Sequence, residues 1–137
     1  MDIKNKFKMH NLKELKIWNK AMGLSVEVYK ATEKFPKKET YGLTSQIRRS
    51  AVSIPSNIAE GAGRKSIHEF RHFLTISNGS SYELQTQIII SNQLSLLSNE
   101  VTEDLLSKIE EIQKMNYSFQ KTLVNSKQQQ DNIISKN

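Results

Sequence analysis

The chain has 137 residues, of which 36% are hydrophobic and 25% are charged, and its formal net charge is +6. This length suits one domain with one modest core. Five Gly and two Pro are too few for the frequent turns of an all-β fold. The absence of cysteine excludes disulfides and thiolate metal sites. No apolar run reaches the length of about eighteen residues that a membrane span needs, and no secretory signal is evident, so we expect a cytoplasmic protein.

The positive charge is concentrated in the first half of the chain. Residues 1–65 contain fourteen Lys and Arg against six Asp and Glu, whereas residues 66–137 contain six against eight. Such asymmetry favours a polyanionic partner, with nucleic acid first, although a basic protein with merely solvated lysines gives the same count.

Residues 1–11 are rich in lysine and lack apolar periodicity, which predicts a flexible basic arm. A helix is predicted over 12–34, and its two apolar stripes cover more of its circumference than one core requires. The excess indicates a second buried contact, most simply a subunit interface. Lys16 and Lys20 lie on the remaining face, which is either a solvated surface or an RNA-binding one.

The segment 43–65 is the most distinctive part of the chain, and its apolar residues recur at the spacing of a helix over about 40–62. Pro55 interrupts this helix, because proline lacks an N–H and crowds the preceding turn. The helix therefore kinks or breaks there. We favour one kinked helix, because the apolar spacing is unchanged across the proline. Gly61 and Gly63 are expected to end it.

A stripe of short polar side chains follows the same helix and suits close packing against another helix through hydrogen bonds, or else a plain exposed face. We expect a buried Arg49 that pairs with a carboxylate, since an unpaired buried charge is very costly. The predicted structural polar network consists of Arg49, Asn57, Glu60 and Glu83. Arg48 points about 100° away from Arg49, and the sequence leaves open whether it reaches solvent, a phosphate or a buried partner.

Arg64 and Lys65 lie in a tight turn before the next predicted helix, 67–97. Ser66 and Glu69 form an S-x-x-E capping box at its start. Two cations beside a helix N-terminus suit a docked phosphate, but a solvated turn is the slightly preferred interpretation.

Small residues make the middle of this third helix slim, so the polar stripe of the second helix would fit against it. Gly79 costs about 1 kcal/mol relative to alanine inside a helix, which indicates a packing reason. His68 and His72 have the i, i+4 spacing of a shared metal, but no third ligand is evident. We therefore predict no metal site and no cofactor.

A fourth helix is predicted over about 101–125, followed by a polar, Gln-rich and disordered tail over 125–137. Four long helices with short connections close most simply as an antiparallel up-down-up-down bundle, here over residues 12–124. The predicted fold class is thus all-α.

Three stretches carry a resemblance to a known family: YGLTSQIRRSAVSIPSNIAEGAGR from Tyr41, EFRHFL from Glu69 and GSSYEL from Gly79. They resemble the four helix bundle protein family first named for reading frames inside intervening sequences of 23S ribosomal RNA genes. The accessory variability determinant protein of diversity-generating retroelements is related to it. The resemblance implies a bundle that assembles as a ring-like homopentamer, association with RNA or RNA-handling partners, and no established enzymatic activity.

We therefore predict a non-enzymatic, oligomeric protein that associates with ribosomal or another structured RNA through a Lys/Arg surface. The predicted nucleic-acid-binding residues are Arg48, Arg64, Lys65, Lys16 and Lys20. The alternative is a protein-binding accessory subunit that docks an RNA-handling enzyme such as a reverse transcriptase. An enzyme is not expected, because the chain lacks the two Glu-x-x-His motifs of a di-iron bundle, a Gly-rich phosphate loop and a nucleophile–base arrangement.

Overall fold

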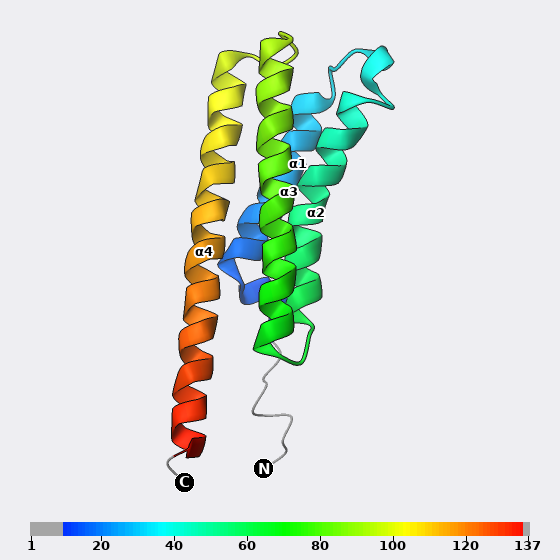
Figure 1. Cartoon of the computed structure of the whole chain (residues 1–137). Coiled ribbons are helices and arrows are strands. Elements are labelled where there is room, and N and C mark those ends of the chain that lie inside the picture. Colours follow the sequence, from blue (N-terminus) through cyan, green and yellow to red (C-terminus); the bar gives the residue numbers. More distant parts are fainter. Residues whose placement is uncertain (1–9, 136–137) are drawn as a thin grey trace.

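A computed structural model describes residues 10–135, so the predicted basic arm lies outside the described residues except for His10 and Asn11. The elements follow one another as shown in Figure 1. They are η2 (Leu12–Glu14), α1 (Lys16–Thr32), η3 (Lys37–Glu39), α2 (Leu43–Ala62), α3 (Ile67–Gln93) and α4 (Asn99–Ser135), where η denotes a 3₁₀ turn. Over the described range there are four α-helices and no strand, which confirms the predicted fold class.

The four helices pack in sequence order around one core (Figure 1). Each helix contacts the next one along the chain, and α1 closes the bundle against α4, while α2 and α3 share the most extensive contact. The start of α1, the turn between α2 and α3 and the C-terminal half of α4 therefore lie at one end of the bundle. We call this the α2–α3 turn end.

The core consists of the apolar positions that helical spacing places on one face of each helix. Its largest fully buried side chains are mostly Leu and Ile, and they come from all four helices. They include Leu24, Ile47, Ile54, Ile58, Leu74, Leu84, Ile88, Leu105 and Ile109. Trp18, Phe35, Met115 and Phe119 are half-buried and pack against this core.

The first helix begins later than predicted. Asn11 caps only the short η2 turn, by accepting a hydrogen bond from the Lys13 N–H at 3.2 Å. Leu15 is extended, and α1 starts at Lys16 without a side-chain cap.

The second helix is continuous through Pro55, which confirms one helix rather than two. Pro55 has no N–H to donate to the carbonyl of Ala51. The hydroxyl of Ser25 on α1 donates to that carbonyl at 2.9 Å instead. The proline thus leaves the Ala51 carbonyl available as an acceptor for a hydrogen bond from α1, and α1 and α2 approach closely at this point.

The slim seam between α2 and α3 is present as predicted. The Ser53 and Ser80 hydroxyls lie 2.8 Å apart, and Ser77 donates to the carbonyl of Ile54 at 2.9 Å. The packing role expected for Gly79 is wrong, because a Cβ at this exposed position would meet nothing within 4 Å.

Both ends of α3 are fixed by local hydrogen bonds. At its start, the Glu69 N–H donates to the Ser66 hydroxyl at 3.1 Å, which confirms the predicted capping box. At its end, Ser95 adopts a left-handed conformation with φ 60°, and the Leu96 N–H donates to the carbonyl of Ser91 at 2.8 Å. The helix therefore ends at Gln93 and not at residue 97.

The tail prediction is wrong for residues 125–135, because α4 continues as a helix to Ser135. This extension carries polar and Gln-rich residues that form a helix readily but pack little, so their composition indicated disorder. Within residues 10–135, none of the helices combines the length and apolar character that crossing a membrane requires.

Candidate nucleic-acid interface

Arg48 and Arg49 have the opposite roles to those predicted. Arg48 is half-buried and donates to the Thr32 hydroxyl at 2.9 Å and to the carbonyl of Tyr29 at 3.2 Å. Its guanidinium also lies 4.5 Å from the centre of the Tyr29 ring. Arg49 is exposed and forms no ion pair with the described residues. Arg48 therefore fastens the C-terminal end of α1 to α2, and Arg49 is not the buried member of a network.

The other members of the predicted polar network are not joined to one another. Glu60 forms an ion pair with Arg64 at 2.6 Å. Asn57 donates within its own helix, to the carbonyl of Ser53 at 2.8 Å. Glu83 accepts a long hydrogen bond of 3.5 Å from Ser50. Between α2 and α3, serine hydroxyls join the two helices in place of the predicted buried charges.

The remaining cations that were predicted to bind phosphate differ in whether they already form ion pairs within the protein. Arg64 is paired with Glu60 and stacks 4.7 Å from the centre of the Phe73 ring. Lys20 pairs with Glu111 at 2.8 Å, although both side chains are about half exposed and such a pair is weak. Lys16 and Lys65 are exposed and have no carboxylate partner among the described residues.

A second group of cations, which the sequence did not single out, lines a groove between α3 and α4. The α3/α4 groove has two adjoining parts of about 350 and 280 Å³. Arg71 and Val124 line both parts, so the two form one continuous depression near the α2–α3 turn end. Its polar lining consists of His68, Arg71 and Asn78 on α3 and Asn116, Tyr117, Gln120, Lys121, Lys127, Gln128 and Asp131 on α4.

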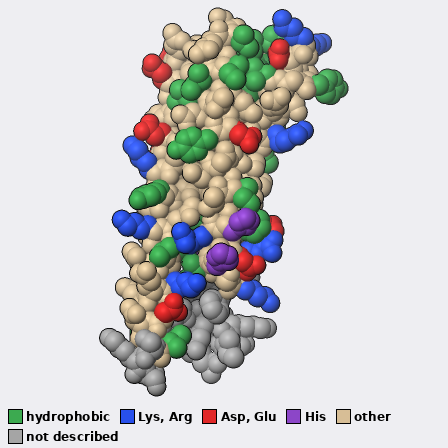
Figure 2. Space-filling view, in the orientation of Figure 1, with side chains coloured by type: hydrophobic (Ala, Val, Ile, Leu, Met, Phe, Trp, Pro, Cys, Tyr) green, Lys and Arg blue, Asp and Glu red, His purple; other side chains and the backbone are tan. Residues whose placement is uncertain are grey.

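The α3/α4 groove is electropositive. Arg71, Lys121 and Lys127 form no ion pair with a described carboxylate, and Asp131 is the sole acidic residue of its lining. Figure 2 shows Lys, Arg and His side chains gathered over the lower half of α3 and α4. An anion that enters the groove would meet cations on both walls.

Asn116 lies at the base of the groove and is held in place by hydrogen bonds. It is 2% exposed, donates to the carbonyl of Leu74 at 2.8 Å and accepts from the Gln120 amide at 2.7 Å. Asn78 lines the same part, and its buried Oδ1 has no hydrogen-bond partner among the described residues. The groove therefore presents amides in fixed positions beside its cations.

Sequence reasoning missed this groove because it counted charge along the chain. Residues 66–137 carry a net negative charge, yet their acidic residues lie mainly in the first turns of α4. The available signal was the helical spacing of Tyr117, Lys121 and Gln128, which places them on one face of α4. Only the antiparallel packing of α3 brings Arg71 to the opposite wall.

The histidines do not form a metal centre in the described part of the chain. No group of three or more His, Cys, Asp or Glu there is placed to hold a metal ion. His10 lies at the end of the bundle, with ring centres 5.1 Å from Phe70 and 6.1 Å from Phe119. Burial against these rings lowers the pKa of His10, so its neutral form is favoured.

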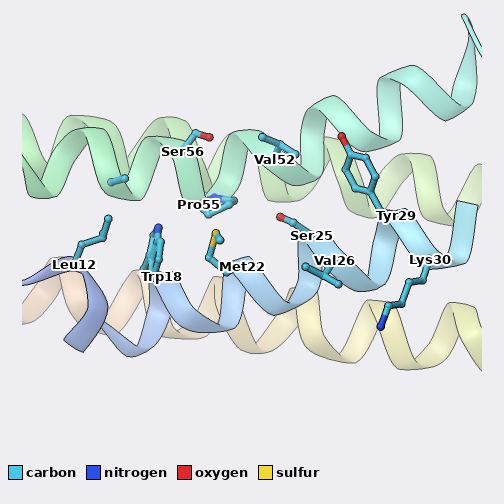
Figure 3. Close-up of a pocket in the computed structure, with 11 residues that line it drawn as sticks. Leu12, Trp18, Met22, Ser25, Val26, Tyr29, Lys30, Val52, Pro55 and Ser56 are labelled. Atoms are coloured by element: carbon cyan, nitrogen blue, oxygen red, sulfur yellow. The ribbon is translucent and has the colours of Figure 1, made fainter.

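An apolar groove of about 510 Å³ lies on another side of the bundle, between α1 and α2. Figure 3 shows Trp18 and Met22 on α1 pointing toward Pro55 on α2. Val26 is 52% exposed and Val52 is 41% exposed in this groove. The α1/α2 groove thus contains the surplus apolar surface that the sequence predicted.

The architecture defines the chain as a small antiparallel four-helix bundle, with a polar groove between α3 and α4 and an apolar groove between α1 and α2. It belongs to the 23S rRNA-intervening sequence protein family, whose model matches residues 13–118.

A solved structure has the same fold. It is a protein of unknown function from the S23 ribosomal protein family of Bacteroides thetaiotaomicron, with a TM-score of 0.70 and 23% sequence identity. The match covers 77% of this chain and 98% of that one. A comparison with curated proteins gives no significant match.

Proposed function

We propose that this protein is a non-enzymatic RNA-associated protein whose α3/α4 groove binds phosphates. The observation that carries the proposal is a set of three cations on the two walls of one groove, Arg71, Lys121 and Lys127, which form no ion pair within residues 10–135. Lys65 and Lys16 lie at the same end of the bundle and extend the positive surface. The name of the family, which refers to 23S ribosomal RNA, favours RNA among the polyanions.

Removal of the three groove cations is expected to lower the affinity for RNA and to make that affinity depend less steeply on salt. Each lost phosphate contact lowers the slope of log K against log salt by about 0.7–0.9 between single strand and duplex, so the triple alanine variant of Arg71, Lys121 and Lys127 should lose about 2–3. Titration of a structured RNA at several salt concentrations measures both quantities.

The matched control replaces Lys34, Lys37 and Lys38, which lie at the opposite end of the bundle, with alanine. It removes the same charge, so equal losses in both variants would show a diffuse electrostatic effect and no site. Absence of RNA binding by the unaltered protein at about 50 mM salt, where screening is weak, would overturn the proposed function.

We also propose that the α1/α2 groove is the contact through which copies of the chain associate. Its exposed apolar residues lie together, and such a patch in water is stabilised by burial against another surface. A homopentamer is the stoichiometry that the family resemblance implies. A protein partner in place of a second copy is the alternative, and the measured mass distinguishes the two.

Val26→Glu is expected to dissociate the assembly, because it places a charge in the apolar α1/α2 groove. Light scattering after size-exclusion chromatography should give a multiple of the monomer mass for the unaltered protein and the monomer mass for this variant. Val101→Glu, on α4 and outside the groove, is the control that should keep the assembly. If the unaltered protein is monomeric, the proposed self-association is wrong, and the α1/α2 groove would instead be assigned to contact with a different protein.

A further inference from the structure

Tyr117 is the aromatic residue that lines the α3/α4 groove, and it is 72% exposed. We propose that this groove binds an unpaired single strand of RNA, with one base stacked on the Tyr117 ring and phosphates on Arg71, Lys121 and Lys127. This inference rests on the proposed RNA association and specifies the form of RNA that the groove takes.

The spacing of these residues suits a strand that runs along α4. Tyr117, Lys121 and Lys127 span ten residues, which is roughly 15 Å along the axis at 1.5 Å per residue, and Lys121 and Lys127 flank the groove from directions about 120° apart around the helix. Arg71 lies on the opposite wall, where it lines both parts of the groove. Cations that line a groove beside an aromatic ring are an arrangement by which proteins hold single strands.

The fixed amides of the groove favour unpaired bases. The Gln120 side chain is held in place by the hydrogen bond that its amide donates to Asn116. Because Gln120 is already fixed, a ligand that hydrogen-bonds to it does not have to order a further side chain. Bases offer hydrogen-bonding edges that are fully free only when the strand is unpaired.

A duplex fits this groove less well. Double-stranded RNA is recognised mostly by shape and by contacts to phosphates and 2′-hydroxyls over a broad surface. Its stacked bases offer no open face to Tyr117. An acidic peptide would use the cations, but it has no base to stack on the ring.

Tyr117 has no structural role that would explain an aromatic residue there. No aromatic contact or hydrogen bond of its side chain occurs within residues 10–135. Alanine in its place would favour the helix, so a change in binding would not reflect unfolding.

The test measures fluorescence anisotropy of a labelled oligouridylate and of an RNA hairpin whose paired stem has a minimal loop. We expect the single strand to bind more tightly than the hairpin at equal salt. Tyr117→Ala should weaken binding of the single strand about tenfold, whereas Tyr117→Phe, which keeps the ring, should bind like the unaltered protein. Tyr82→Ala is the control, because Tyr82 is also exposed on the bundle but lies outside the groove.

Two results would overturn the inference while leaving the proposed function intact. One is equal or tighter binding of the hairpin, and the other is unchanged affinity in Tyr117→Ala when the triple alanine variant of the groove cations loses affinity. Failure of both RNAs to bind at about 50 mM salt would overturn the proposed function and this inference together.

Discussion

Gly61→Ala is expected to destabilise the bundle by about 2 kcal/mol, although alanine is the better helix former. A Cβ at this buried position would lie 2.8 Å from Phe70 Cδ1, 2.9 Å from Phe73 Cβ and 3.1 Å from the carbonyl oxygen of Phe70. The first atom belongs to a ring held edge-on against Phe119, and the others belong to the rigid start of α3. The helices must therefore separate at the α2–α3 turn end.

Thermal unfolding at one fixed protein concentration measures this effect, since the proposed assembly would make the melting temperature depend on concentration. Gly79→Ala is the matched control and should stabilise the protein by about 1 kcal/mol, because its Cβ would meet nothing within 4 Å. The two substitutions are chemically identical and should shift the melting temperature in opposite directions. A shift in the same direction would contradict the close approach at Gly61.

The two glycines show what helical periodicity predicts and what it omits. Periodicity placed the four helices and the apolar face of each one, because core burial depends on spacing along the chain. It gave no means to tell which glycine lies at a helix crossing, since crossing points depend on how two helices pack. Gly61 was therefore assigned to helix termination, and Gly79 was assigned to packing.

The reversed roles of Arg48 and Arg49 also arise because helical periodicity does not show how two helices pack. Neighbouring residues on a helix point about 100° apart, so at most one of the two could belong to the polar stripe. The sequence assigned that role to Arg49 because of the polar residues around it. The partner of Arg48 is instead the C-terminal end of α1, whose carbonyl and ring at Tyr29 become a target only after α1 and α2 pack together.

The α3/α4 groove was hidden for a further reason. Its residues belong to two segments with little net charge, so a count over halves of the chain averages their cations with distant carboxylates. Ion pairing within the protein also determines which cations are available to bind a ligand. Lys20, Arg64, Lys108 and Lys114 form ion pairs with carboxylates, whereas Arg71, Lys121 and Lys127 form none with the described residues. The charge available to a ligand thus depends on tertiary structure more than on composition.

Arg48→Ala is expected to destabilise the protein by about 2 kcal/mol. The substitution removes a cation–π contact worth about 0.5–2 kcal/mol and two hydrogen bonds to the end of α1. It also removes a positive charge from a helix C-terminus, where the helix dipole favours one. The melting temperature should fall by several degrees, at about 4 °C per kcal/mol for a domain of this size.

Arg49→Ala provides the control, because it removes the same charge from an exposed neighbouring position and should change stability by less than about 0.5 kcal/mol. Arg48→Lys should recover only part of the loss, since lysine keeps the charge but lacks the planar fork that reaches Thr32 and Tyr29 together. A stable Arg48→Ala variant with weakened RNA binding would contradict the structural role and return Arg48 to the phosphate-binding set. Unchanged RNA binding, measured at a temperature where the variant is folded, would instead place the phosphate contacts elsewhere on the bundle.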